Sequence, residues 1–106
     1  MPKYLVEASY TPDGVKGLMK EGGAARRAAA ESLVASMGGT IEAFYYAFGD
    51  ADAYLVIDLP DNASAMAASL AVNASGAVAL KTTVLITAEE MDEATRRSAD
   101  YTPPTS

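Results

Sequence analysis

The sequence predicts an α+β fold whose elements follow the order β-α-β-β-α-β, with a further helix near the C-terminal end. Three observations carry this prediction. Four alternating segments rich in strand-forming residues occur within 106 residues. Two Ala-rich segments with helical periodicity separate them, and Gly and Pro mark the ends of the elements. Two of the strand segments flank a short Gly/Asp turn, which is typical of an antiparallel hairpin.

The first half of the chain contains one strand and one helical region. Strand-like alternation predicts a strand over residues 3–10. A helical region follows over residues 14–37, and its apolar stripe ends at Gly38. Gly22 and Gly23 should kink or split this region, because each glycine costs about 1 kcal/mol relative to Ala inside a helix.

The second half contains the other strands and two helices. We predict a strand over 40–48, a turn over 49–52, a strand over 53–59, a helix that Asp61 or Asn62 caps and that ends near 73, and a strand over 78–87. Thr87 and Glu90 have the spacing of a capping box, so a short helix should run to about Ala99. Residues 1–101 then form one domain, and residues 102–106 an extended or disordered tail.

This order of elements is the split βαβ or ferredoxin-like arrangement. Its two crossovers should be right-handed, which places both main helices on one face of a four-stranded antiparallel sheet. We therefore expect the strand order 4-1-3-2, with an extra C-terminal helix that follows the two β-α-β units.

Composition excludes several kinds of chemistry. The chain has no Cys and no His, so thiol nucleophiles, imidazole bases and His- or Cys-held metals are excluded. A net charge of −6 disfavours nucleic acid and anionic membranes as partners. We expect a cytoplasmic chain, because Glu7 interrupts the N-terminal apolar run and no stretch approaches the ~20 apolar residues that a membrane span requires.

Strand alternation divides the sheet into two faces. One set is nearly all apolar and should lie under the helices: Val6, Ala8, Ile41, Ala43, Tyr45, Ala47, Leu55, Ile57, Leu59, Val78, Leu80, Thr82, Val84 and Ile86. The other set mixes aromatic and charged residues: Leu5, Glu7, Ser9, Glu42, Phe44, Tyr46, Phe48, Tyr54, Val56, Asp58, Lys81, Thr83 and Leu85. Such a mixture is typical of an interface between subunits or of a ligand-lined cavity. We expect a homodimer or higher homo-oligomer through the second face, unless a bulge shifts the alternation.

Four carboxylates are candidate catalytic groups. Glu7, Glu42 and Asp58 share the second face, where neighbouring carboxylates could share a proton or bind a hard cation. The alternative is that they are solvated or paired with Lys81. The turn residues Gly49, Asp50 and Asp52 suit a turn through positive φ and side-chain hydrogen bonds, whereas a functional role would place Asp52 at the rim of a cavity.

Arginine and tyrosine side chains are the candidate ligand-binding groups. Arg26 and Arg27 follow the glycine pair at the start of a helix, where a carboxylate or phosphate could be received. The alternative is a solvated helix face. Tyrosines of the sheet could line a pocket or simply fill the core or an interface. The candidate set is Tyr10, Arg26, Tyr46 and Tyr54.

An ordered series of segments resembles the GYD domain family. The segments are Lys3-Tyr4-Leu5-Val6, Tyr10-Thr11-Pro12-Asp13-Gly14, Glu21-Gly22-Gly23-Ala24-Ala25-Arg26-Arg27, Glu42-Ala43-Phe44-Tyr45-Tyr46-Ala47-Phe48-Gly49-Asp50, Asp58-Leu59-Pro60-Asp61-Asn62, Val72-Asn73-Ala74-Ser75-Gly76 and Leu85-Ile86-Thr87-Ala88-Glu89-Glu90-Met91. Ala51 stands where the family usually has Tyr. The resemblance implies a ferredoxin-like fold of the dimeric α/β-barrel type and no particular activity.

Two kinds of function remain open from the sequence. The first is a homo-oligomeric assembly or small-molecule-binding module without cofactor or metal. The alternative is a cofactor-independent enzyme, of the monooxygenase, isomerase or decarboxylase type, that acts on a small organic substrate with an Asp, Glu or Tyr base. A metal-assisted enzyme would need two or more carboxylates that converge on one point.

Overall fold

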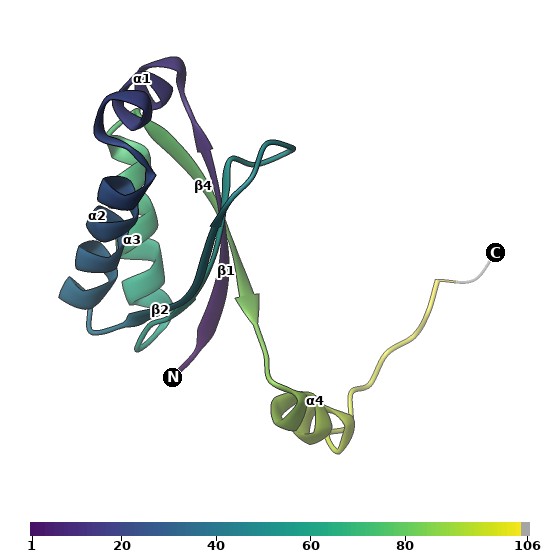
Figure 1. The fold of residues 1–106 in the computed structure, drawn as a ribbon. Helices are drawn as coiled ribbons and strands as arrows, with labels where there is room; N and C mark the ends of the chain where they lie inside the picture. The colour runs from purple at the N-terminus through teal and green to yellow at the C-terminus, as the bar shows by residue number, and fades with distance from the viewer. Residues whose placement is uncertain (105–106) are drawn as a thin grey trace.

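The chain folds into two layers, with helices against one face of a single sheet (Figure 1). The fold is taken from a computed structural model that describes residues 1–104. Its elements are β1 (Lys3–Tyr10), α1 (Pro12–Glu21), α2 (Gly23–Ser36), β2 (Thr40–Tyr46), β3 (Ala53–Asp58), α3 (Asn62–Ala74), β4 (Val78–Leu85) and α4 (Ala88–Thr95). The predicted α+β fold is confirmed.

The sheet contains four antiparallel strands in the order β2-β3-β1-β4. Read from the opposite edge, this order is 4-1-3-2. The long strand β1 lies between β3 and β4, and its residues pair with both neighbours along most of its length. In Figure 1, α2 and α3 lie side by side against one face, and α1 sits at the end of the sheet where β1 ends.

The core lies between the helices and the centre of the sheet. Its fully buried members are Tyr4, Val6, Ala8, Val34, Ala53, Leu55, Ile57 and Leu59. Strands β1 and β3 supply most of them, because every second side chain of these central strands faces the helices. The Tyr4 hydroxyl donates a hydrogen bond to Asn62 Oδ1 at 2.7 Å, so the one polar atom of this ring is satisfied.

Local signals place the helix ends. Thr11 accepts from the N–H of Gly14 and Pro12 opens α1, while Asp61 accepts from the N–H of Ser64 and caps α3. Gly22 separates α1 from α2 with a φ of 89°, a conformation that glycine adopts at little cost. The predicted split of the helical region is therefore confirmed.

A β-bulge in β2 overturns part of the predicted division into faces. Ile41 pairs with Ile57 but Ala43 pairs with Val56, so the ladder gains an extra residue at Glu42. Beyond this point the alternation is reversed. Phe44 packs against the buried core on the helix side, whereas Tyr45 is 73% exposed. The predicted placement of Phe44 and Tyr46 on the second face, and of Ala43 and Tyr45 under the helices, was wrong.

The hairpin between β2 and β3 is longer than predicted. Strand β2 ends at Tyr46 instead of 48, and six residues, 47–52, form the connection. Positive φ angles occur at Gly22, Gly38 and Gly76 within the described residues, so the predicted positive φ at Gly49 was wrong. Phe48 lies in this connection and is fully exposed.

The C-terminal helix lies away from both layers. The capping box of Thr87 and Glu90 is present and opens α4, as predicted. The helix ends at Thr95, four residues before the expected end, and Figure 1 shows it beyond the end of β4 and clear of the other helices. Residues 98–104 contain no helix or strand, and the end of the predicted tail, 105–106, lies outside the described residues. None of the helices among residues 1–104 is long and apolar enough to cross a membrane.

Candidate functional site

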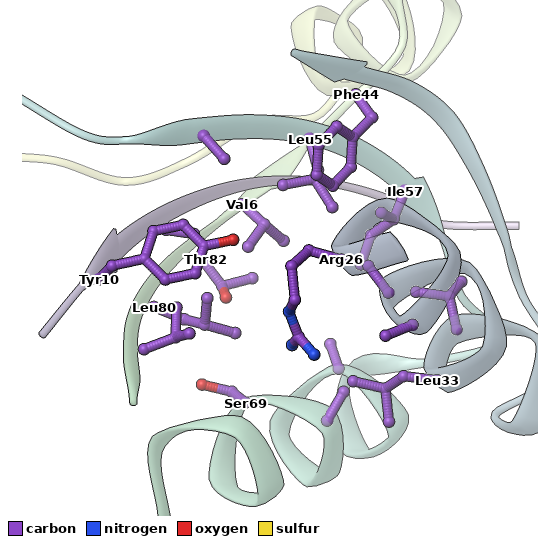
Figure 2. A pocket seen from close by; sticks show the side chains of 18 residues that line it. Val6, Tyr10, Arg26, Leu33, Phe44, Leu55, Ile57, Ser69, Leu80 and Thr82 are labelled. Atoms are coloured by element: carbon purple, nitrogen blue, oxygen red, sulfur yellow. The ribbon is translucent and has the colours of Figure 1, made fainter. Parts of the chain in front are cut away.

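A cavity of about 150 Å³ lies between α2, α3 and the covered face of the sheet (Figure 2). We call it the helix–sheet cavity. It is lined by Val6, Ala8, Tyr10, Arg26, Ala29, Ala30, Leu33, Val34, Phe44, Ala53, Leu55, Ile57, Ala65, Ala68, Ser69, Val78, Leu80 and Thr82. All four strands and both long helices contribute to it.

Small helix residues leave this space open. Ala29 and Ala30 of α2, with Ala65 and Ala68 of α3, line the cavity on the helix side. A methyl group at each of these positions is too short to fill the gap above the branched and aromatic side chains of the sheet. Unfilled volume in a core lowers the free energy of unfolding, so the cavity reduces the stability of this domain.

Polar side chains gather at one end of the cavity. Among the lining residues, all of them within the described part of the chain, Arg26 alone carries a charge. Figure 2 shows its side chain extending from α2 into the space between the helices and the sheet. The hydroxyl groups of Tyr10, Ser69 and Thr82 lie on the same side of this view, whereas Leu33 and Ile57 lie on the other. We call Tyr10, Arg26, Ser69 and Thr82 the polar end.

A second tyrosine, the third predicted ligand-binding residue, adjoins the polar end. The Tyr46 hydroxyl donates to the carbonyl oxygen of Gly23 at 2.9 Å, which attaches β2 to the start of α2. Partial burial raises the pKa of Tyr46 above its ordinary value of 10.0, and the neighbouring Tyr10 hydroxyl acts in the same direction. The positive charge of Arg26 opposes this rise in the pKa of Tyr46. Tyr10, Arg26 and Tyr46 therefore lie together.

The fourth predicted ligand-binding residue lies elsewhere. Tyr54 faces away from the helices, opposite Glu7 on β1 and Tyr45 on β2. The sheet thus separates Tyr54 from the other three candidates. The bulge accounts for this separation, because it moves Tyr46 to the helix side and leaves Tyr45 beside Tyr54.

The predicted carboxylate cluster is held by a lysine. Lys3 Nζ lies 2.9 Å from Glu42 Oε2 and 2.9 Å from Asp58 Oδ1. The hydrogen bonds that Lys3 donates to Glu42 and, as the smaller cause, to Asp58 raise the pKa of Lys3. Glu7 lies farther along β1, opposite Lys81 on β4. Within residues 1–104, no group of three or more acidic side chains is placed to hold a metal ion.

Asp52 attaches the hairpin connection to β1. Its carboxylate accepts a hydrogen bond from the N–H of Tyr10 at 2.8 Å, and its own N–H donates to the carbonyl oxygen of Ala8 at 2.8 Å. It lines a surface groove with Tyr10, Leu18 and Tyr46, not the helix–sheet cavity. Gly49 and Asp50 are exposed in the same connection.

Sequence reasoning missed two polar residues of the cavity. Thr82 was assigned to the helix-covered face but received no role. A hydroxyl group among the mostly apolar residues of that face could have indicated a polar group inside a cavity. Ser69 received no role, although it lies one residue after Ala68 on the buried side of α3. The alanines at 29 and 30 of α2 and at 65 and 68 of α3 leave unfilled volume between the helices and the sheet. The sequence indicates this volume only when both helices are known to cover the same part of the sheet.

The fold and the site define a ferredoxin-like α+β domain with a mainly apolar cavity that has one charged residue. The chain belongs to the GYD domain family, whose model matches residues 4–95. The match ends at the last residue of α4. No curated protein and no solved structure matched the chain.

Proposed function

We propose that this protein is a small-molecule-binding module whose ligand occupies the helix–sheet cavity. The observation that carries the proposal is the cavity of about 150 Å³ between α2, α3 and the sheet. Concave sites lined mainly by apolar groups, with a few polar groups that converge, are the usual form of ligand sites. A volume of about 150 Å³ accommodates a molecule about as large as benzene.

The enzymatic alternative has less support. The candidate carboxylates Glu7, Glu42 and Asp58 lie outside the cavity, and Asp52 is held by backbone hydrogen bonds in the hairpin connection. An enzyme that used this cavity would therefore depend on Tyr10 as its base. Binding without chemistry requires only the space and the groups at its polar end.

Filling the cavity tests the proposal. Leu in place of Ala65 or Ala30 would project into the space that the ligand needs, whereas Ala67→Leu changes an exposed position of α3 and is the matched control. We expect millimolar benzyl alcohol, a neutral probe, to raise the Tm of the wild type and of Ala67→Leu by several degrees. Both filled variants should lose this response. Equal responses in the filled variants and the control, or no response in the wild type, would contradict the proposal.

We also propose that two copies of the chain associate through the uncovered face of the sheet, in a cytoplasmic homodimer. We call this surface the open face. It comprises Lys3, Leu5, Glu7, Ala43, Tyr45, Tyr54, Val56, Asp58, Lys81, Thr83 and Leu85.

The charges of the open face favour a second copy as its partner. Lys3 is paired with Glu42 and Asp58 within the chain, and Glu7 lies opposite Lys81. A partner therefore need not supply countercharges, and the apolar surface around Leu5 and Val56 can be buried at a lower desolvation cost.

Sedimentation of two arginine variants tests the dimer. Val56→Arg places a charge in the middle of the open face, whereas Met19→Arg changes an 80% exposed residue of α1 and is the control. We expect the wild type and Met19→Arg to sediment as dimers at about 50 μM, well above a micromolar Kd, and Val56→Arg as a folded monomer. A monomeric wild type at this concentration would contradict the dimer and leave the cavity proposal unaffected.

A further inference from the structure

Polar groups are distributed unevenly in the helix–sheet cavity. A ligand that fills it meets the Arg26 guanidinium near the middle of the space, three hydroxyl groups beside Leu80 on one side, and aliphatic or aromatic side chains alone on the other (Figure 2). A molecule with one polar group and an apolar body matches this distribution better than a molecule that is polar throughout. The distribution of polar and apolar lining residues therefore favours an amphipathic ligand.

Arg26 has an ion-pair partner that engages it weakly. Its Nη1 lies 3.3 Å from Glu21 Oε2, and the two side chains are 37% and 49% exposed. Charge-assisted hydrogen bonds are usually 2.7–2.9 Å long, and a guanidinium group can form two parallel bonds with one carboxylate. Glu21 makes one long contact with Nη1, so a carboxylate from a ligand could bind the planar edge of Arg26 more favourably.

The surroundings of Arg26 favour an anion over a neutral group. No carboxylate lines the helix–sheet cavity among the residues that the structure describes, and most of the lining residues are apolar. A charge beside apolar walls is screened less than one in water, so its attraction for an opposite charge is stronger. The rest of the chain is acidic, with a net charge of −6, which disfavours ligands that carry several negative charges.

The volume limits the body of the ligand. About 150 Å³ is enough for one six-membered ring or a short branched chain. Phe44, Leu55 and Leu33 line the part of the cavity that such a body would occupy. Nucleotides and lipids with long acyl chains are much larger than this space.

From these observations we infer that the ligand is a small apolar monocarboxylate, whose carboxylate binds Arg26 and whose hydrocarbon body lies between the sheet and the alanines of α2 and α3. The inference rests on the proposed function, because it requires the helix–sheet cavity to be the binding site. Arg27 is adjacent in sequence but pairs with Glu31 at 3.8 Å and lies outside the cavity. It takes no part in binding.

Calorimetry with benzoate and benzamide at pH 7 tests this inference, because the two probes share their size and differ in charge. We expect the wild type to bind benzoate at least about tenfold more tightly than benzamide, a free-energy difference of roughly 1.4 kcal/mol. Arg26→Gln should bind the two probes within about twofold of each other, and Arg27→Gln should behave like the wild type. Equal affinities in the wild type, or an undiminished preference for benzoate in Arg26→Gln, would overturn the inference.

A second variant excludes a merely structural role for Arg26. Glu21→Gln removes the competing carboxylate and keeps the arginine, so benzoate affinity should rise about two- to fivefold, as expected for loss of a partly exposed ion pair. An unchanged or lower affinity would contradict the role of Arg26. Neutral benzamide should bind unchanged in Glu21→Gln. If benzamide binds as well as benzoate and both are lost in Ala65→Leu, the carboxylate inference fails while the cavity proposal stands; if neither probe binds the wild type, both fail.

Discussion

The two faces of the sheet differ in what limits their packing. On the covered face, core side chains such as Tyr4 and Leu59 are almost completely buried, yet the alanines of the helices leave a cavity above Val6, Leu55 and Ile57. On the open face, the side chains around Val56 are half-buried by their neighbours in the strands and meet no second layer among residues 1–104. The covered face thus has a second layer that leaves a cavity above it, whereas the open face has no second layer.

This difference is what the two proposed modes of binding require. A concave, mainly apolar space between two layers suits a small molecule. A flat surface with apolar residues and internally paired charges suits a second protein surface. The same strands serve both faces, since successive residues point in opposite directions.

The largest expected difference between the faces is in the cost of truncation. Ile57→Ala should lower the free energy of unfolding by about 2–5 kcal/mol, because Ile57 is 5% exposed and its removal enlarges a core that already contains a cavity. Val56→Ala, at the next position of the same strand, should cost about 1 kcal/mol in the monomer. Urea unfolding at low protein concentration measures both. Similar costs at the two positions would show that the faces are equally packed.

A smaller difference is expected for tyrosine hydroxyl groups. Tyr4→Phe removes the hydrogen bond to Asn62 and should lower the free energy of unfolding by about 1 kcal/mol. Tyr54→Phe, the same change on the open face, should alter it by less than about 0.5 kcal/mol. Denaturant unfolding at pH 7 measures both values, and a larger loss in Tyr54→Phe would reverse the expected order.

Tyr4 should also make the free energy of unfolding depend on pH. Burial raises the pKa of Tyr4 above its ordinary value of 10.0, and the charge of Asp61 adds to the effect. The contribution of neutral Tyr4 to stability is therefore complete below pH 10 and is lost as the pH rises through the raised value. Wild-type unfolding between pH 8 and pH 11 should show this loss, and Tyr4→Phe should show a smaller one. An identical alkaline decline in both proteins would assign it to other groups.

The smallest expected effect concerns the bulge. Deletion of Glu42 leaves Ile41 opposite Ile57 and Ala43 opposite Val56, so the strand becomes regular while Phe44 stays under the helices. It removes one exposed ion pair with Lys3 and should change the free energy of unfolding by about 1 kcal/mol or less. Deletion of Phe44 is the contrast, because this ring is partly buried against the core and its loss should cost up to the roughly 3–5 kcal/mol of a truncated buried Phe. Comparable losses in the two deletions would contradict the reversed alternation.

Local signals were enough to predict most of the fold. The capping residues Thr11, Asp61 and Thr87 and the break at Gly22 act within a few residues of themselves, so the sequence predicts them directly. The bulge at Glu42 depends on the pairing of β2 with β3, which alternation along one strand does not contain.

The candidate site was predicted in part for the same reason. Tyr10 and Arg26 were identified by their chemical type and both line the helix–sheet cavity. Their neighbours Ser69 and Thr82 come from other elements, and only the packing of α3 and β4 brings them close. Tyr46 and Tyr54 were grouped on one face because a regular strand would place them there, and a single extra residue separates them.

The bulge also affects how related chains should be compared. The extra residue at Glu42 reverses which side chains of β2 face the helices. Before the bulge the odd-numbered residue Ile41 faces them, and after it the even-numbered residues Phe44 and Tyr46 do. A relative that lacks the residue at position 42 can keep the same surface pattern with a shorter β2. Aligned without a gap there, its cavity residues would be matched with residues that face outward here. Variation that looks like the loss of a binding residue would then be a difference of one residue in length.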